Sequence, residues 1–211
     1  ERGVECRHRT RCIIQAQARR AEAREGTGAR RLHAHGLAVH RSGLGEVTGL
    51  RLESMQLPAS YRAQFDFPRH GVQGTRTLTG VAEGALVGTI IKPNVGLSAR
   101  QTAELVARLC EAGVDFIKDD EVCADPAHAP LAERVPAVMA VVRQHQQRSG
   151  KHVMVAFNIS DETDAMRRHA DLVQREGGSC VMASLNWCGY SALQTLRRHT
   201  PLVIHGHRNG Y

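Results

Sequence analysis

From residue 86 onwards, short apolar runs alternate with longer amphipathic stretches, at a spacing of roughly 25 to 35 residues that is typical of βα units. Each run has the length of a β-strand, and each stretch between runs has the length of a helix. The predicted strands are Leu86–Lys92, Val114–Lys118, Val153–Asn158, Cys180–Leu185 and Leu202–His205. The predicted helices are Ser98–Glu111, Pro130–Arg148, Asp161–Glu176 and Ser191–His199.

Residues that favour helix ends stand at the borders of these stretches. Ser98 and Asp161 are expected to be N-caps, because a short oxygen-bearing side chain can accept hydrogen bonds from the first free N–H groups of a helix. Gly113 and Gly177 are expected to end two helices, because glycine adopts the left-handed conformation that often follows the last turn.

Apolar strands separated by helices predict an α/β fold with a parallel sheet, either an open doubly wound sheet or part of a (β/α)8 barrel. Lys92, Lys118, Asn158 and residues 205–208 lie at the carboxyl ends of different predicted strands, where barrel enzymes carry their chemistry. This placement favours a partial (β/α)8 TIM barrel with five strands and four helices in residues 86–211. Five strands cannot close such a barrel, so this part is interpreted as its first half.

The residues before the barrel have a different composition. Residues 1–43 are rich in Arg, Ala and Gly, contain no aromatic residue and are a poor candidate for a packed core, so this segment is expected to be disordered or atypical. Residues 44–85 contain one predicted strand, Val47–Leu52, and several Pro and Gly residues. They are interpreted as a connecting region or a remnant of an N-terminal domain.

Composition and charge exclude some classes of protein. An apolar fraction of 42% with no long uninterrupted apolar run, and no signal-like start, predicts a cytoplasmic protein rather than a membrane protein. The six cysteines form no C-x-x-C pair and are expected to be free thiols. Residues 1–43 hold ten arginines and four glutamates, and so carry six of the seven net positive charges. A nucleic-acid-binding tail stays an alternative for this segment, although it has no aromatic residue for base stacking.

The segment Asp115–Glu121, which reads DFIKDDE, contains the clearest candidate chemistry. On a strand, Lys118 and Asp120 project to the same side, and a bend at the strand end can bring Glu121 beside them. Carboxylate oxygens suit Mg²⁺, and a lysine could join them only after CO2 converts its amine into an anionic carbamate. A solvated cluster of charges at a strand end has the same composition and remains the alternative.

Three ordered segments resemble the RuBisCO large-subunit superfamily. Residues 88–98 read GTIIKPNVGLS and resemble the family segment G-T-I-x-K-P-K-x-G-L-S, and residues 113–121 read GVDFIKDDE and resemble G-x-D-F-x-K-D-D-E. Residues 205–208 read HGHR and resemble H-x-H-R, and with Asn209 and Gly210 they are most similar to the RuBisCO-like proteins, form IV. The resemblance covers the barrel region, about 60% of the chain.

The resemblance implies roles for individual residues. Lys118 would be the carbamylated lysine, with Asp120 and Glu121 as the other protein ligands of Mg²⁺. Lys92 would be an acid/base group beside the metal, with a pKa lowered by the dication. His207 would be a catalytic polar contact to the substrate.

Substrate-binding positions are implied in the same way. Arg208 would clamp a phosphate group, for which its planar guanidinium is suited. Asn94 and Asn158 would lie at the substrate together with Lys92 and His207. His205 and His207 also form an H-x-H pair of the kind that binds transition metals, but the sequence offers no convincing third nitrogen or sulfur ligand for zinc.

The implied activity is formation of an enediolate from a phosphorylated sugar or keto-acid, with an enolase, isomerase or decarboxylase outcome, by a homodimer or higher homo-oligomer. Asn94 replaces the second lysine of K-P-K, which argues against CO2 fixation, although a genuine ribulose-bisphosphate carboxylase remains the alternative. The sequence ends at Tyr211, after the fifth predicted strand, so an inactive truncated remnant is a further alternative. With unpaired strand edges, the chain alone is expected to be poorly soluble or inactive.

Overall fold

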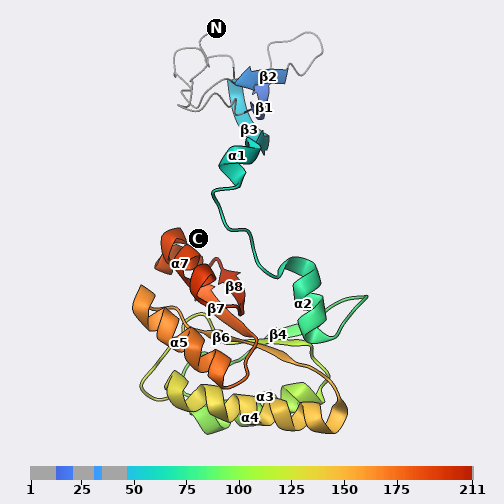
Figure 1. Cartoon of the computed structure of the whole chain (residues 1–211), viewed down its shortest axis with the longest axis vertical. Helices are drawn as coiled ribbons and strands as arrows, with labels where there is room; N and C mark the ends of the chain where they lie inside the picture. The colour runs from blue at the N-terminus through green and yellow to red at the C-terminus, as the bar shows by residue number, and fades with distance from the viewer. Residues whose placement is uncertain (1–12, 21–30, 35–46, 211) are drawn as a thin grey trace. The chain divides into compact units, whose positions relative to one another are not determined.

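The computed structural model describes residues 13–20, 31–34 and 47–210, with side chains from Gln56 onwards (Figure 1). The expectation of disorder for residues 1–43 therefore falls mostly outside the described residues. The chain divides into two compact units, residues 1–65 and residues 66–211. This division lies inside the segment 44–85 that the sequence presents as a connecting region.

The first unit contains a small antiparallel sheet. Its strands are β1 (Ile13–Arg20), β2 (Arg31–Ala34) and β3 (Val47–Gln56), in the order β2-β1-β3. A single-turn helix, α1 (Ala59–Arg62), follows β3. Only the start of β3 was expected from the apolar pattern, because the sequences of β1 and β2 are too polar to stand out as strands.

The second unit contains the five parallel strands expected from the sequence. They are β4 (Gly88–Ile90), β5 (Phe116–Lys118), β6 (Met154–Asn158), β7 (Cys180–Ser184) and β8 (Val203–His207). Each pairs with the next along the chain, in the order β4-β5-β6-β7-β8. The last strand continues two residues beyond its predicted end, so that His207 belongs to it.

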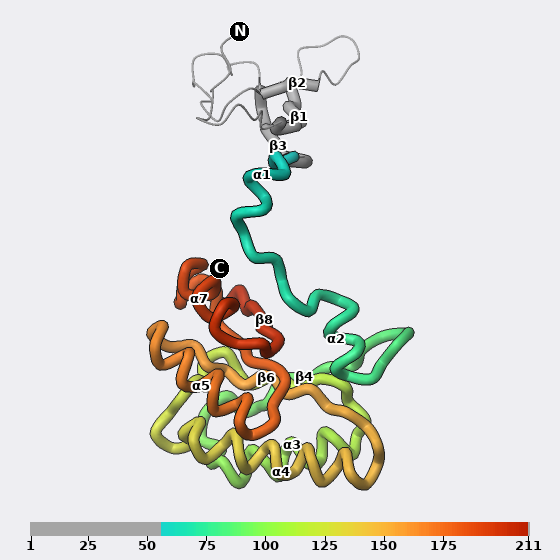
Figure 2. Tube along the Cα trace, viewed as in Figure 1, coloured from blue at the N-terminus to red at the C-terminus, as the bar shows by residue number. Residues whose placement is uncertain are grey.

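Helices follow the strands as expected. They are α3 (Ala99–Glu111), α4 (Leu131–Ser149), α5 (Thr163–Arg175), the short α6 (Leu185–Cys188) and α7 (Tyr190–His199). Helices α3 and α4 lie side by side along the same layer, as Figures 1 and 2 show. A helix that the sequence did not predict, α2 (Gly71–Thr79), precedes β4.

The two faces of the sheet have different neighbours, as β6 illustrates. Val155 and Phe157 point into the main apolar cluster, which also contains side chains from α3, α4, α5 and α7. Met154 and Ala156 point to the opposite face, where they form a smaller cluster with Leu78 of α2 packed against it. Alternation along the strand then places Asn158 on the face that the helices α3, α4, α5 and α7 do not cover.

Strand order decides between the two architectures left open by the sequence. In a doubly wound sheet the strand order reverses and helices cover both faces, whereas in a barrel consecutive strands are neighbours and the βα helices lie outside. Here the order is sequential, and α3, α4, α5 and α7 all pack on one face. The second unit is therefore part of a (β/α)8-type barrel, with Leu78 of α2 on its inner side.

The helix ends confirm most of the expected signals and correct one. Ser98 caps α3 in a reciprocal capping box with Gln101. Gly113 and Gly177 have φ of +84° and +81°, as expected for glycines after helices. The expected cap Asp161 is wrong, because the longer side chain of Glu162 accepts the N–H groups of the first turn of α5.

No helix in the part of the chain that the structure describes is long and apolar enough to cross a membrane.

Candidate functional site

Polar residues from four strands meet at the carboxyl edge of the barrel sheet. Lys118 is the last residue of β5, Asn158 ends β6 and His207 ends β8, while Lys92 stands two residues beyond β4. All strands run in the same direction, so their carboxyl ends lie at one edge. The topology thus brings together residues that are far apart in the sequence.

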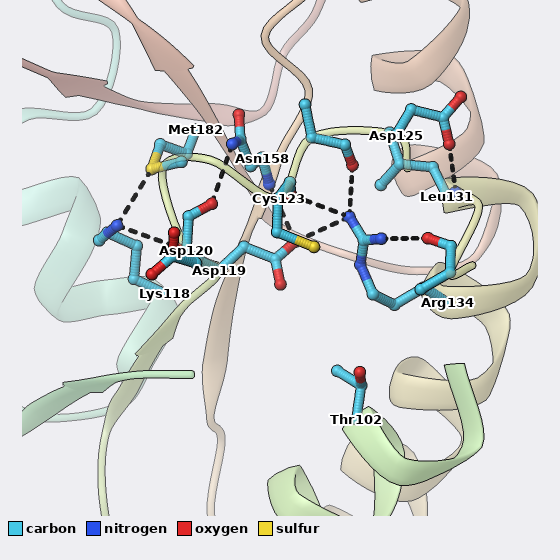
Figure 3. Close-up of polar contacts among 12 residues, drawn as sticks. Thr102, Lys118, Asp119, Asp120, Cys123, Asp125, Leu131, Arg134, Asn158 and Met182 are labelled. Atoms are coloured by element: carbon cyan, nitrogen blue, oxygen red, sulfur yellow. Dashed lines mark hydrogen bonds and ion pairs between the residues drawn. The ribbon is translucent and has the colours of Figure 1, made fainter. Parts of the chain in front are cut away.

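Lys118 is buried and surrounded by one charged and two neutral acceptors. Its Nζ donates to the carbonyl oxygen of Asp119 at 2.8 Å and to Oε2 of Glu121 at 3.1 Å. It also lies 3.5 Å from Sδ of Met182, on the inner side of β7 (Figure 3). The expected bend after β5 is therefore present, because Glu121 turns back towards the lysine three residues before it.

Asp120 is almost completely buried and pairs with the lysine that follows β4. Its Oδ2 lies 2.5 Å from Nζ of Lys92, and its Oδ1 accepts the backbone N–H of Val122 at 3.0 Å. The hydrogen bond with Asp120 raises the pKa of Lys92 above its usual value. The direction is opposite to the lowered pKa expected beside a dication, because the nearest charge to Lys92 in this arrangement is a carboxylate.

Glu121 is partly exposed and forms the outer side of the cluster. A hydrogen bond from its own backbone N–H and one from Lys118 hold the pKa of Glu121 below its usual value. The cluster therefore consists of two lysine–carboxylate pairs, each within hydrogen-bonding distance. The pairs are Lys92–Asp120 and Lys118–Glu121. The formal charge of this four-residue cluster is zero when all four groups are ionised.

Asn158 braces the segment that carries the two acids. Its Nδ2 donates to the carbonyl oxygens of Asp120 at 2.9 Å and Glu121 at 3.0 Å. Its Oδ1 accepts the N–H of Ser160 at 3.1 Å. Because both ends of this fully buried amide already have protein partners, the structure gives Asn158 a supporting contact, and the expected contact to a substrate stays a prediction.

The two histidines of β8 lie on the same side of the strand, as expected from alternation. Their ring centroids are 6.2 Å apart, and the ring of His205 lies 5.5 Å from that of Phe116. Burial lowers the pKa of His205, and the charge of Lys118 adds to the effect. Nδ1 of His207 accepts the N–H of Asn209 at 3.1 Å, so a neutral His207 carries its proton on Nε2 and can donate it to a ligand.

Two further sequence-predicted residues lie at the surface. Arg208 is exposed directly after β8, and Asn94 is exposed in the segment after β4. Asn94 also lines a small pocket whose wall includes Asp119, Asp120 and Arg134. Asn94 and Asp120 thus line the same pocket, and the contact of Asn94 with a substrate stays a prediction.

Metal-ligand geometry limits what the cluster can bind as it stands. Among the residues whose side chains are described, no three His, Cys, Asp or Glu side chains gather as a metal site. His205 and His207 therefore have no third ligand of these types within that part of the chain. The cluster at Lys118 supplies two carboxylates, and a third anionic oxygen requires chemical conversion of the lysine.

Three important residues were not identified from the sequence. Asp119 was given no role in the sequence analysis, yet its buried carboxylate accepts hydrogen bonds from Arg134 and from the backbone of Asn158. Arg134 gave a signal, since it lies three residues after Leu131 and four before Val138, on the apolar stripe of its helix. Met182 gave no signal distinguishable from that of an ordinary core residue.

The chain is similar to proteins of known family. Residues 71–211 match the family model of the ribulose bisphosphate carboxylase large chain, catalytic domain. A 3-oxo-isoapionate-4-phosphate transcarboxylase/hydrolase from Xanthobacter autotrophicus is 51% identical over 80% of this chain and 41% of its own length. A 3-oxo-isoapionate-4-phosphate decarboxylase from Rhizobium etli is 45% identical over 78% of this chain and 40% of its own length.

A solved structure agrees in sequence and in fold. The crystal structure of a RuBisCO-like protein from Burkholderia fungorum has 74% identity and a TM-score of 0.74, over 80% of this chain and 42% of that chain. The chain thus spans about two fifths of the length of the proteins that it matches. By the match over residues 71–211, together with the parallel barrel strands and the K-D-D-E segment, this chain belongs to the ribulose bisphosphate carboxylase large-chain family, and it resembles that family's RuBisCO-like members.

Proposed function

We propose that this chain forms part of a RuBisCO-like enzyme that decarboxylates a phosphorylated 3-oxo sugar acid, using a Mg²⁺ ion held by carbamylated Lys118, Asp120 and Glu121. The names of two relatives, a transcarboxylase/hydrolase and a decarboxylase of 3-oxo-isoapionate 4-phosphate, support the substrate class. The observation that carries the proposal is the paired arrangement Lys92–Asp120 and Lys118–Glu121 at the strand ends.

The donor set fits a magnesium ion in charge and in type. With both lysines protonated the cluster is neutral and has no charge for a cation. Carbamylation replaces the positive charge of Lys118 by a negative one, so that the cluster then carries a formal charge of −2, which matches a divalent cation. Asp120 and Glu121 supply further oxygen ligands of the kind that Mg²⁺ prefers. When bound, the ion supplies positive charge that stabilises an oxyanion developing on the substrate.

The surroundings of Lys118 are compatible with this conversion. The carbamate forms from the neutral amine, which loses a proton as it attacks CO2. Nζ lies beside the uncharged sulfur of Met182 and a backbone carbonyl, and Glu121 is the one carboxylate that contacts it among the side chains described from Gln56 onwards. The side chain of Lys118 is only 11% exposed, so a carbamate formed on it would lie largely away from bulk water.

In the proposed reaction, the bond between the carboxylate and the adjacent carbon of the 3-oxo acid breaks. Its electron pair moves onto that carbon and the neighbouring carbonyl oxygen, which leaves CO2 and an enolate, or an enediolate where a hydroxyl group is adjacent. Lys92 then donates a proton from its ammonium group to the carbon. Its side chain is 55% exposed, so solvent can return the proton.

The residues of the β8 end bind and orient the substrate in this proposal. His207 donates a hydrogen bond from Nε2 to a substrate oxygen, since its Nδ1 is held as an acceptor by Asn209. Arg208, exposed beside it, binds the phosphate group through its guanidinium fork. Asn94 contributes a neutral amide where true carboxylases of this family carry a lysine, which favours loss of a carboxyl group over CO2 fixation. The enzyme acts as a homodimer or higher homo-oligomer, as in the family it resembles.

Two assays test this proposal. The first compares release of CO2 from a phosphorylated 3-oxo sugar acid with incorporation of labelled CO2 into ribulose bisphosphate. Release without incorporation supports the decarboxylase, and rapid incorporation contradicts it in favour of a carboxylase. The second follows the ¹³C carbamate signal of the protein with labelled bicarbonate and Mg²⁺, in the wild type and in Lys118→Arg. A signal that persists in Lys118→Arg contradicts the assignment of the carbamate to Lys118.

A further inference from the structure

A buried ion pair lies directly behind the proposed metal ligands. Arg134 of α4 is 1% exposed, and its Nη2 lies 3.3 Å from Oδ2 of Asp119, which is 2% exposed (Figure 3). Asp119 stands between Lys118 and Asp120 in the sequence. Its carboxylate takes part in neither of the two lysine–carboxylate pairs of the cluster. The pair is therefore adjacent to the site and outside it.

The same guanidinium also holds the segment that follows the ligands. Nη2 of Arg134 donates to the carbonyl oxygens of Cys123 at 3.3 Å and Ala124 at 2.5 Å, and Nη1 donates to the carbonyl oxygen of Ala129. One planar, permanently charged group thus contacts both ends of the connection between β5 and α4. This connection contains both proposed acidic ligands.

A second brace acts from the opposite side. The backbone N–H of Asn158 donates to Oδ2 of Asp119 at 3.1 Å, so this carboxylate oxygen is shared between Asn158 and Arg134. The side chain of Asn158 holds the carbonyl oxygens of Asp120 and Glu121. Asp119 is thereby fixed between α4 and the end of β6.

Packing of the apolar stripe of α4 does not by itself account for a charge at this position. Replacing a whole buried ion pair by uncharged groups of similar size often leaves the stability of the fold unchanged or increases it. In addition, Nε of Arg134 is buried and has no hydrogen-bond partner among the described residues, which is unfavourable. An apolar side chain at this position would have no unpartnered Nε, but it would leave the carboxylate of Asp119 without its cation and the carbonyl groups of the β5–α4 connection without their donor.

We propose that Arg134 is a positioning residue: through Asp119 and the carbonyl groups of the β5–α4 connection, it fixes the carboxylates of Asp120 and Glu121 for metal binding. This inference rests on the proposed function for the identity of the ligand, and on the contacts above for the positioning itself. Residues that orient metal ligands from behind change metal affinity by about 10- to 100-fold when they are replaced.

The test uses a double variant, Asp119→Asn with Arg134→Met, in the full chain. A single change at Arg134 leaves the buried carboxylate of Asp119 without its cation, whereas the double change removes both charges and keeps similar volumes. Arg143→Met is the matched control, since Arg143 lies on the same helix but is exposed and donates to the carbonyl oxygen of Glu176, away from the β5–α4 connection. Three quantities are measured: Mg²⁺ affinity with bicarbonate, the urea midpoint of unfolding, and amide hydrogen exchange.

Exchange at Val122 and Cys123 reports on positioning without any metal, because both N–H groups donate to Asp120. We expect the double variant to exchange these amides faster and to bind Mg²⁺ about 10- to 100-fold more weakly. Its urea midpoint should also fall, because the carbonyl groups of Cys123, Ala124 and Ala129 lose their donor. The control is expected to match the wild type in all three. Unchanged exchange together with unchanged affinity in the double variant overturns the proposal.

The remaining outcomes are also decisive. If the wild type takes up no Mg²⁺, the proposed function fails, and exchange at Val122 and Cys123 alone supports or overturns the positioning role. If the double variant unfolds, Arg134→Lys replaces it, because a lysine keeps the charge near Asp119 but cannot reach all three carbonyl groups at once. Wild-type exchange and affinity in Arg134→Lys then overturn the proposal.

Discussion

Nζ of Lys92 lies 2.5 Å from Oδ2 of Asp120, although the two residues are 28 positions apart and belong to the ends of different strands. The contact joins the segment after β4 to the segment after β5. It also gives a buried carboxylate its counter-ion and raises the pKa of Lys92. The proposed acid/base group and a proposed metal ligand are therefore in direct contact.

Lys92→Met and Lys92→Arg are both expected to lower the rate of CO2 release by about 100- to 10,000-fold, because a positioned proton donor contributes a factor of this size. Arginine keeps a positive charge beside Asp120 but does not give up its proton at neutral pH. Thermal unfolding measured alongside the rates shows whether the fold is kept. Near-wild-type activity in Lys92→Arg would mean that Lys92 only neutralises Asp120.

Asp115, at the opposite end of the sheet from the candidate site, predicts a pH-dependent part of the stability. Its carboxylate lies 2.8 Å from Nζ of Lys151 and accepts the N–H of Val87 at 2.8 Å. The hydrogen bond with Lys151, followed by that with Val87, holds the pKa of Asp115 below its usual value of 3.8. The folded state therefore favours the ionised form, and the stabilisation is present above pH 3.8 and lost as the pH falls through the lower folded-state pKa.

We accordingly expect Asp115→Asn to lower the free energy of unfolding at pH 7 by on the order of 1 kcal/mol, since a partly exposed charged hydrogen bond is weakened by solvent. The difference from the wild type should shrink as the pH falls below the usual range of an aspartate. Urea unfolding at several pH values from 7 to below the pKa measures both. A difference that stays constant across this range contradicts the assignment.

Cysteine reactivity is expected to follow burial. Cys180 is fully buried on the inner face of β7, and desolvation raises its pKa to about 12. Because the thiolate is the reactive form, iodoacetamide should label Cys180 more than 100-fold more slowly than the half-buried Cys188 in the native protein near pH 8. Mass spectrometry of peptides from native and urea-unfolded samples measures both rates. Equal native rates for the two thiols would show that the sheet opens readily.

Phe157 is expected to be a main source of stability on the helix-covered face of the sheet. It is 1% exposed and belongs to the main apolar cluster. Phe157→Ala should lower the free energy of unfolding by about 3 to 5 kcal/mol, through lost burial and the cavity that it leaves. Val72→Ala, at an exposed position of α2, is the control and should change it by less than about 0.5 kcal/mol. A loss below 1 kcal/mol in Phe157→Ala would mean that the cluster repacks.

The sequence predicted the barrel strands and the helices between them because their periodicities are local properties. Alternation on a strand was enough to place His205 and His207 on one side, and the capping box at Ser98 depends on residues three positions apart. The polar strands β1 and β2 carry no such apolar signal and were not predicted. At Asp161 the choice between two neighbouring acids depended on side-chain reach, so the expected cap was displaced by one residue.

The sequence by itself determined which residues gather at the carboxyl edge of the sheet, since parallel strands carry their last residues to one edge whatever else the chain does. Only the tertiary structure decided which partners those residues take. Asp120 could have faced Lys118 but pairs with Lys92, and Asp119 turns away to Arg134. The reason is that alternation fixes the side of a strand on which a residue lies. The partner it meets there depends on the paths of segments 15 to 39 residues away, which local patterns do not encode.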